Sequence, residues 1–445
     1  MEACSVVSMT SLTLRSRAAI AAGKGASWAS RRLGRGSGGM IGGKVALKLA
    51  PNLLADLAAH RRSAVVSGTN GKSTTTRLLR AALFAIGEVA SNTNGDNMTP
   101  GITTALMRSH APLAALEVDE MHMPVVSRFV NPQAIVLLNL SRDQLDRVGE
   151  IGAVERRLRK AVNEHPDSIV IANCDDPLIA SAAWDSPNVQ WVAAGHAWMG
   201  DSTAFPRGGR VIHSDDSWRV VPLTSVSGEE GLEKYQRPEP MWWLEDEDLS
   251  DAAHPAAVAC RKDGLRIPLR LSLPGRANLS NALEALAAAV AMGVDPQAAC
   301  RAMSQVEEVA GRYSTYEIHG RLARLMLAKN PAGWQEAMYM IDPAVDQVIV
   351  AVNGQVADGQ DLSWLWDVDF SVLGAPTRKV YACGERGADL AVRLEYAGVH
   401  CELFPLPMEA LRACTPGRVE ILLNYTALRD FKRVLDSHRE AEEAE

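Results

Sequence analysis

A short glycine-rich turn between a strand and a helix constrains this chain more than any other feature. The apolar residues Val65 and Val66 predict a buried strand, and Gly68-Thr-Asn-Gly-Lys-Ser73 follows. A helix that opens on Lys72 and Ser73 directs its first backbone N–H groups at the turn, and this arrangement favours a bound phosphate. Lys72 can neutralise phosphate charge and the Ser73 hydroxyl can hold Mg²⁺. The usual first glycine of such a loop is replaced by Val66, so an ordinary strand–turn–helix remains the alternative.

The length and composition of the chain indicate a large, soluble globular protein. The 445 residues exceed one ordinary core and predict two domains, with three as the alternative. A net charge of −7 argues against a general nucleic-acid binder. Seven scattered cysteines without a C-x-x-C pair indicate reduced thiols. We therefore expect a cytoplasmic protein without a disulfide framework.

The first 62 residues are strongly basic, with ten Lys/Arg against Glu2 and Asp56. Cationic residues such as Arg17 and Lys24 alternate with apolar ones such as Trp28. Three interpretations stay open: a solvated helix packed on the first domain, a basic helix resting on an anionic membrane face, and an organelle transit peptide. Six glycines in the ten residues 34–43 predict a flexible joint after this helix.

Short apolar runs separated by helical stretches predict a parallel sheet with crossover helices over the first half of the chain. The expected strands are 63–68, 113–118, 134–139 and 168–173. Sites in such sheets lie beyond the carboxyl ends of the strands. Glu117, Asp119, Asn139 and Asn173 fall at those ends, on the same edge as the glycine-rich turn.

Two further regions follow. Residues 186–272 carry turn-forming residues, five tryptophans and a dense acidic run, and we expect a solvated excursion with short β pieces. A strong helix is expected over 280–292, capped by Ser280 or Asn278 and ended by Gly293. A second α/β alternation follows. Its expected strands are 322–328, 347–352, 378–383 and 419–424.

Several polar clusters are candidates for chemistry. A carboxylate at a strand end that faces a phosphate loop is suited to Mg²⁺, and Glu117 is the candidate, with helix-capping as the alternative. The amide-rich loop 92–97 can orient a substrate carboxylate or be a simple turn. Asp143 and Asp146 are either site residues or helix caps. In the second domain, four acids surround Trp364 and Trp366, and a half-buried turn is the alternative.

These motifs together resemble the Mur ligase superfamily over nearly the whole chain. Gly68–Ser73 is similar to its short ATP loop, and Asn139-Leu-Ser-Arg-Asp143-Gln144-Leu-Asp146 is similar to its N-L-x-x-D-H-L-D segment, with Gln144 in place of His. Asn278-Leu-Ser-Asn281 resembles its adenine-contacting N-x-x-N, and Gly311-Arg312 its hinge. The resemblance is strongest to the MurT branch. Its markers are Asn94–Gly101, the turn Leu327–Gly333 and the segment Asp358–Asp367.

The resemblance implies an α/β fold with a Mur ligase-like central ATPase domain and a smaller α/β C-terminal domain, without an N-terminal UDP-binding domain. The implied boundaries are 1–43, 44–312 and 313–445. It also implies the catalytic subunit of a glutamine-dependent amidotransferase. Such a subunit converts the α-carboxylate of D-glutamate in the lipid II stem peptide to D-isoglutamine through an acyl phosphate, with ammonia from a GatD-type glutaminase. This places the protein in the cytoplasm, with the inner membrane face as a possible site of peripheral binding.

The resemblance also assigns residues. Lys72, Glu117 and Asp367 are the implied catalytic residues, where Asp367 orients the partner's catalytic His and Asp361 and Asp369 are the alternatives. Ser73 and Glu117 are the implied Mg²⁺ ligands. The implied ATP contacts are Gly68, Thr69, Asn70, Gly71, Lys72, Ser73, Thr74, Asn278, Asn281 and Arg312.

One departure concerns metal. Many MurT chains carry a four-cysteine zinc ribbon in the middle domain, whereas the region 186–272 has only Cys260, with Cys174 nearby. Two thiols cannot close a tetrahedral site without histidines, and the histidines here are irregularly spaced, so we expect no zinc and a region stabilised by tryptophan packing. Two other functions stay open: a related muramyl or folylpolyglutamate-type ligase that joins an amino acid to a carboxylate, and a non-catalytic subunit that holds a glutaminase at a membrane.

Overall fold

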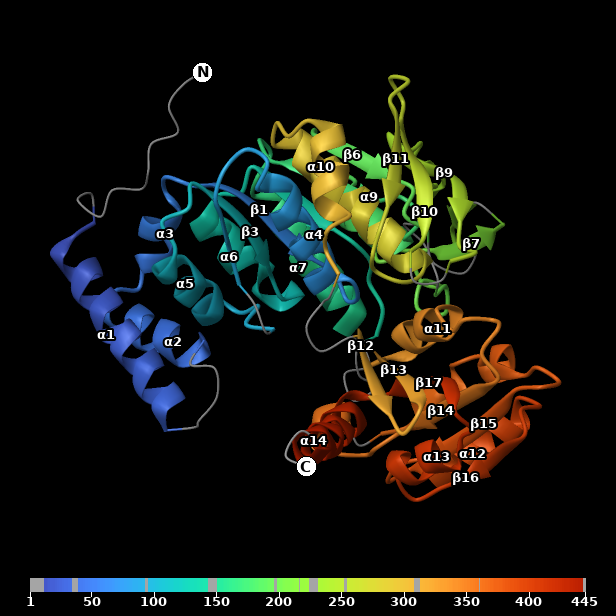
Figure 1. Ribbon diagram of the computed structural model, residues 1–445. Helices are drawn as coiled ribbons and strands as arrows, with labels where there is room; N and C mark the ends of the chain where they lie inside the picture. Colours follow the sequence, from blue (N-terminus) through green and yellow to red (C-terminus); the bar gives the residue numbers. More distant parts are fainter. Residues whose placement is uncertain are drawn as a thin grey trace. The chain divides into compact units, whose positions relative to one another are not determined.

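The computed structural model describes residues 12–33, 39–92, 95–142, 150–195, 198–215, 217–223, 231–251, 254–307, 313–359 and 361–442. The chain divides into two compact units (Figure 1). The first contains residues 1–140 and 151–307, and the second contains 141–150 and 308–445. The expected hinge Gly311-Arg312 lies outside the described residues.

Three helices open the first unit: α1 (Leu14–Arg32), α2 (Gly39–Leu49) and α3 (Leu53–Ala58). Helix α1 packs along α2, and α2 packs on α5 (Thr99–Arg108). Small residues permit this close packing, because a Cβ at Gly43 would lie 1.8 Å from the carbonyl oxygen of Pro100. The prediction of a flexible joint over 34–43 is therefore wrong for Gly39–Gly43, which form the first turn of α2. Helix α1 packs on α2, as the first of the three interpretations of the basic segment requires, and its outer side is exposed.

A nine-stranded sheet forms the centre of the first unit, in the order β11-β10-β9-β6-β5-β4-β1-β3-β2. Neighbouring strands from β2 to β9 pair in parallel, whereas β9, β10 and β11 pair antiparallel. The strands are β1 (Arg62–Ser67), β2 (Val89–Ser91), β3 (Leu113–Glu117), β4 (Ala134–Leu137), β5 (Ile169–Asn173), β6 (Val189–Val192), β9 (Trp242–Asp248), β10 (Ala256–Arg261) and β11 (Arg266–Arg270). All four strands expected in this half of the chain are confirmed to within two residues.

Helices cover both faces of this sheet. On one face α4 (Lys72–Leu83), α9 (Arg276–Ala291) and α10 (Pro296–Met303) pack on one another. The other face buries one continuous apolar core beneath α1–α3, α5 and three further helices. These are α6 (Met123–Val130), α7 (Glu150–Asn163) and α8 (Pro177–Ala183). The layers match the doubly wound arrangement expected from alternating strands and helices.

The region 186–272 differs from its prediction. Strands β6, β9, β10 and β11 extend the central sheet, so this region is not a separate surface excursion. Trp242, at the start of the acidic strand β9, is fully buried. Exposure rises along β9 from Trp242 to the acidic residues 246–248, so the acidic composition concealed a strand of the central sheet.

A small second core lies between β6 and β9 in the sequence. The hairpin β7 (Arg210–Ser214) and β8 (Ser217–Val221) buries Trp218 against Phe205 and Tyr235. The Trp218 indole donates to the backbone oxygen of Cys174 at 2.8 Å and so ties the hairpin to the end of β5. Aromatic packing, as predicted, stabilises this part of the chain.

Helix α9 begins at Arg276 after Gly275, which adopts a φ of +84°. The predicted caps at Asn278 and Ser280 are wrong, because the chain turns at Pro274-Gly275 and helical geometry starts four residues before Ser280. The predicted end is close, since the helix stops at Ala291 and Gly293 has a φ of +90°.

The second unit has a six-stranded sheet in the order β12-β13-β17-β14-β15-β16, antiparallel only between β12 and β13. Its strands are β12 (Tyr313–Ile318), β13 (Arg321–Leu327), β14 (Gln347–Ala351), β15 (Lys379–Cys383), β16 (Cys401–Leu403) and β17 (Gly417–Leu423). Its helices are α11 (Pro331–Tyr339), α12 (Gly387–Tyr396), α13 (Pro407–Ala413) and α14 (Tyr425–Glu442). The four expected strands are confirmed, and the edge strands β12 and β16 were not predicted.

No helix among the described segments of either unit combines the length and apolar character needed to cross a bilayer.

Candidate active site

The glycine-rich turn connects the end of β1 to the start of α4, as its sequence predicts. Gly68 and Gly71 have φ values of +137° and +85°, which residues other than glycine rarely adopt. Both also lie against neighbouring groups. A Cβ on Gly68 would approach the backbone oxygen of Asn139 to 2.9 Å, and one on Gly71 would lie 2.3 Å from Asn281 Oδ1. The two glycines are therefore required by conformation and by space.

Asn139, just beyond β4, holds the turn in place. Its backbone oxygen accepts from the Thr69 N–H at 2.8 Å. Its side chain brackets Asn70, accepting from the backbone N–H at 2.9 Å and donating to the carbonyl oxygen at 3.1 Å. The turn is thus fixed from a neighbouring strand. The sequence pointed to Asn139 only as a polar residue on the site edge.

Lys72 begins α4 and its ammonium group turns back over the loop. It donates to the carbonyl oxygens of Gly68 at 2.5 Å and Thr69 at 3.2 Å, and to Glu120 Oε1 at 2.8 Å. Burial raises the pKa of Glu120, and the neighbouring Lys72 opposes that rise. Glu120 belongs to the group of three carboxylates, Glu117, Asp119 and Glu120, that the sequence marks at the end of this strand, but the sequence-based assignment gave a role to Glu117 alone.

Glu117 ends β3 beside Val66 of β1 and is nearly fully buried. Asn92 holds its backbone, accepting from the Glu117 N–H at 2.9 Å and donating to its oxygen at 2.8 Å. The Asn97 amide donates to Glu117 Oε1 at 3.2 Å. The described part of the loop 92–97 therefore positions Glu117, whereas residues 93 and 94 lie outside the described residues.

Two amides of α9 lie next to the turn. Asn281 Oδ1 accepts from the Thr75 hydroxyl at 3.2 Å, and its amide nitrogen donates to Asn278 Oδ1 at 3.2 Å. Asn278 in turn donates to the backbone oxygen of Pro274 at 2.7 Å. These contacts bring Asn281 to the phosphate turn, and they leave the predicted adenine contact of both residues a prediction.

Ser73 and Thr74 occupy the first turn of α4, where Ser73 is half-buried and Thr74 is buried. Four other predicted site residues lie outside the described residues. They are Asp143, Gln144, Asp146 and Arg312.

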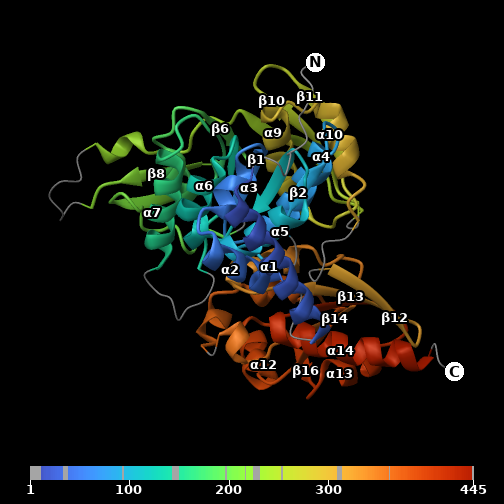
Figure 2. The same cartoon turned by 90° about the vertical axis from the view of Figure 1, so that its left-hand side faces the viewer.

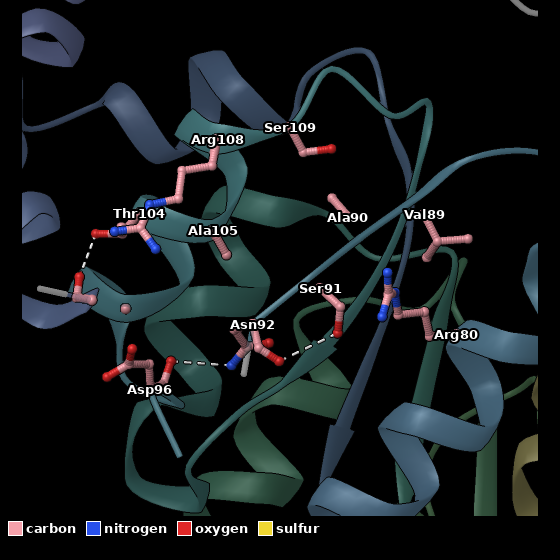
Figure 3. Close-up of a pocket in the computed structure, with 12 residues that line it drawn as sticks. Arg80, Val89, Ala90, Ser91, Asn92, Asp96, Thr104, Ala105, Arg108 and Ser109 are labelled. Atoms are coloured by element: carbon pink, nitrogen blue, oxygen red, sulfur yellow. Dashed lines mark hydrogen bonds between the residues drawn. The ribbon is translucent and has the colours of Figure 1, made fainter. Parts of the chain in front are cut away.

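A pocket of about 310 Å³ lies beside the edge strand β2 (Figure 3). Arg80 of α4 lines one side, and Arg108 lies with Asp96 on the other. Burial raises the pKa of Asp96, and Arg108 opposes that rise. Asn92, which lines the pocket, donates to the backbone oxygen of Asp96 at 3.1 Å and also holds Glu117. One asparagine thus connects the pocket wall to the strand end at the phosphate turn.

In the second unit the candidate acids have different surroundings. Asp361 and Asp369 each accept from the backbone N–H two residues later, and hydrogen bonds to Ser363 and Ser371 lower their pKa values. These two carboxylates close local turns. Asp367 is placed differently: it pairs with Arg142, in the 141–150 segment of the same unit, at 3.3 Å, and its side chain is 37% exposed.

Asp358 is structural, because its carboxylate accepts from the Thr426 backbone N–H at 3.0 Å at the start of α14. The two tryptophans of this segment also differ. Trp364 is buried and stacks on Trp334 at 5.6 Å, whereas Trp366 is 56% exposed and meets Tyr396 edge-on at 5.4 Å. The alternative of a half-buried turn holds for part of the segment, and Asp367 and Trp366 stand outside it.

Among the described residues, no group of three or more His, Cys, Asp or Glu side chains is arranged to hold a metal ion. His196 lies outside those residues. The expectation that this chain lacks zinc stays a prediction.

Comparisons with known proteins agree with this architecture. Residues 66–199 match the Mur ligase middle domain and residues 327–428 match the MurT ligase C-terminal domain. The lipid II isoglutaminyl synthase (glutamine-hydrolyzing) subunit MurT of Streptococcus pneumoniae is 28% identical over 96% of this chain and 98% of its own length. The Staphylococcus aureus (strain COL) subunit of the same name is 27% identical over 87% and 89%.

Solved structures show the same fold at lower identity. A MurF from Acinetobacter baumannii superposes with a TM-score of 0.65 at 15% identity, covering 88% of this chain and 80% of that one. MurF ligase from Thermotoga maritima in complex with ADP gives 0.60 at 14% identity, covering 88% and 83%.

Proposed function

We propose, from its place in the MurT branch of the Mur ligase family, that this chain is the ATP-dependent subunit of a lipid II isoglutaminyl synthase. It would amidate the α-carboxylate of D-glutamate in the lipid II stem peptide, with glutamine as the nitrogen source. The observation that carries the proposal is the turn Gly68–Ser73, held by Asn139 and joined in one chain to a MurT-type C-terminal domain.

The residues of the turn fit a nucleotide triphosphate. Two glycines leave room where a Cβ would clash, and the start of α4 presents backbone N–H groups. The Ser73 hydroxyl and the Glu117 carboxylate are oxygen donors of the kind Mg²⁺ prefers. The ion would supply charge neutralisation, and Lys72 would bind the phosphate oxygens after leaving Glu120.

A carboxylate resists attack by ammonia, because its oxygen is a poor leaving group. Transfer of the terminal phosphate to the carboxylate gives an acyl phosphate, and ammonia then displaces phosphate to leave the amide. This chain's contribution is positioning and charge stabilisation rather than covalent chemistry. The acceptor carboxylate would bind in the pocket beside β2. The two arginines of this pocket suit an anionic group, and Asn92 connects its wall to Glu117.

The second unit supplies the candidate contact with a glutaminase of the GatD type. Orientation of a histidine by a carboxylate fixes its tautomer. Asp361 and Asp369 accept from backbone N–H groups of their own turns, whereas Asp367 pairs with a side chain, Arg142, that a partner can displace, so Asp367 is the acid that suits this role. The exposed pair Trp366 and Tyr396 supports a docking surface there, because aromatic side chains are enriched at protein interfaces.

The alternative function is a ligase that joins an amino acid to the same activated carboxylate. The match of residues 327–428 to the MurT C-terminal domain favours amidation. The intact turn, with Lys72 and Glu117 both in place, argues against a purely non-catalytic subunit.

The test is a reconstituted amidation assay with the glutaminase copurified from co-expression, lipid II, MgATP and either glutamine or ammonium. We expect Lys72→Ala to lose product with both nitrogen sources, because phosphate transfer precedes ammonia attack. Product formation by Lys72→Ala at the wild-type rate would refute the role of the turn. An amino acid in place of ammonium as the better nucleophile would favour the alternative ligase.

Asp367→Asn tests the second assignment. We expect it to lose glutamine-driven product while ammonium restores amidation, because only the partner's histidine is misoriented. Asp361→Asn is the matched control, and it should keep both activities. Failure of ammonium to restore Asp367→Asn would show that Asp367 does not act through the glutaminase.

A further inference from the structure

The outer side of α1 carries one stripe of exposed side chains. Leu14, Arg17, Lys24, Trp28 and Arg32 follow one another at helical spacing and all are exposed, whereas the opposite side packs on α2. We call this stripe, with its helix end Arg31 and Leu33 and the exposed side of α2, the N-terminal face. Figure 2 shows α1 and α2 at the outside of the first unit.

Charge on the N-terminal face has one sign. No Asp or Glu occurs between Ala3 and Ala55, although the whole chain carries −7. Asp56, the first acid after this stretch, accepts from the Ser16 hydroxyl at 2.6 Å on the buried side of α1. Helix α2 adds the exposed Lys44 and Lys48. The complement of such a face is an anionic surface.

Large apolar side chains are exposed among these cations. Leu14 is 84% exposed, Trp28 61% and Leu33 70%. A nucleic-acid duplex is bound through its phosphates and gives exposed leucine side chains no partner, whereas a bilayer interface accepts cations at the phosphate level and indole and leucine side chains just below it. Alanine and glycine occupy the positions between them, so α1 can lie close to a flat surface.

We propose that the N-terminal face docks this protein on an anionic phospholipid bilayer. The inference deepens the proposed function, because a lipid-linked substrate has to be met at a membrane. Gly39, the first residue of α2, also lines the pocket beside β2. Docking through α1 and α2 would thus place the proposed acceptor pocket next to the lipid surface.

The test uses the full-length protein and vesicles that contain no lipid II, in the absence of ATP. Cosedimentation is compared for vesicles with about 30% phosphatidylglycerol and for neutral phosphatidylcholine vesicles. We expect binding to the anionic vesicles alone, falling steeply between about 0.05 M and 0.5 M salt because surface charges are then screened. Equal binding to neutral vesicles, or none to either, would overturn the proposal.

Charge reversal then locates the surface. Each Lys or Arg near an anionic surface contributes about fivefold to partitioning, so the triple variant Lys24→Glu, Arg31→Glu, Arg32→Glu should bind at least about 100-fold more weakly. The matched control reverses three exposed arginines on strands of the same unit. These are Arg210, Arg219 and Arg270. Equal loss in both triple variants would show a net-charge effect and refute a dedicated face.

Two further measurements distinguish binding to lipid from a purely electrostatic contact and from binding to nucleic acid. Trp28→Ala removes no charge and should still weaken vesicle binding several-fold, which a purely electrostatic contact would not show. A fluorescent single-stranded oligonucleotide tests the other anionic partner, and binding as tight as to vesicles would contradict a lipid-facing role. If amidation fails while vesicle binding persists, the proposed function is wrong and the membrane face stands.

Discussion

Asn139→Ala is the most direct test of how the phosphate turn is held. The substitution removes both side-chain hydrogen bonds to Asn70 and keeps the bond from the Thr69 N–H to the Asn139 backbone. Each such bond stabilises by about 0.5–1.5 kcal/mol net. If both act only to preorganise the turn, the loss in nucleotide binding lies between about 1 and 3 kcal/mol. Because the backbone bond to Thr69 and the contacts of Lys72 remain, we expect a loss near the lower end of this range. It corresponds to a rise in the Kd for nucleotide of about 5- to 15-fold.

Isothermal titration with a non-hydrolysable ATP analogue and Mg²⁺ measures this change. Asn139→Asp should bind more weakly still, because its second oxygen faces the Asn70 carbonyl and cannot donate, and its charge repels phosphate. The matched control is Asn188→Ala, which removes an exposed amide bond to the Pro166 oxygen elsewhere in the first unit.

The result that would refute the reasoning is an unchanged Kd for Asn139→Ala together with a lowered melting temperature. Asn139 would then support the fold without organising the turn. Equal loss of affinity in Asn188→Ala would likewise show that the effect is general destabilisation rather than a property of the turn.

Three further predictions concern stability and are measured by urea unfolding. Gly43→Ala should lower the free energy of unfolding by about 1–3 kcal/mol, because its Cβ would meet a backbone carbonyl of α5 at 1.8 Å. Gly25→Ala, in open space on α1, should raise it by about 0.5–1 kcal/mol. Equal effects of the two substitutions would contradict the packing. Burial raises the pKa of Glu284 well above its usual value, so the free energy of unfolding should fall as the pH rises from about 4.5 through the pKa of the folded state. Glu284→Gln should flatten that fall. Parallel pH profiles of the wild type and the variant would refute the role of Glu284. Arg324→Met should lower the free energy of unfolding by about 3–5 kcal/mol, because the carboxylate of Glu420 stays buried without its partner at 2.7 Å. Adding Glu420→Leu should recover most of this loss. No recovery would show that the first substitution costs packing and not charge pairing.

The parts of the fold that the sequence predicted are those where local pattern and tertiary role agree. Strand β1, the turn at Gly68 and helix α4 follow directly from an apolar run, two glycines and Lys-Ser. The acidic strand β9 was missed because only its first residue, Trp242, is buried, whereas the exposed carboxylates at its other end dominated the composition. Gly39, Gly42 and Gly43 were interpreted as part of a joint because glycine weakens isolated helices, whereas here close contacts with Asp96, with α1 and with α5 require them.

The strand ends and the turn that carry the candidate residues were predictable from the sequence, but the hydrogen bonds between those residues were not. Glu117 could be placed at a strand end from the sequence, yet its hydrogen bonds to Asn92 and Asn97 join segments about 20 residues apart and have no local signal. Glu120 could be recognised as the partner of Lys72 only when β3 was placed beside β1. The distinction between Asp367 and its neighbours likewise depends on which acids close their own turns.

The path of the chain between β6 and β9 has an evolutionary consequence. Val192 and Trp242 are paired neighbours, so about fifty residues leave and re-enter the central sheet at adjacent points. Material inserted there can change in length or in its means of stabilisation without shifting the strands on either side. The hairpin and its aromatic cluster can then be exchanged for another small stabilised segment, and such a chimaera should leave strands β6 and β9 paired.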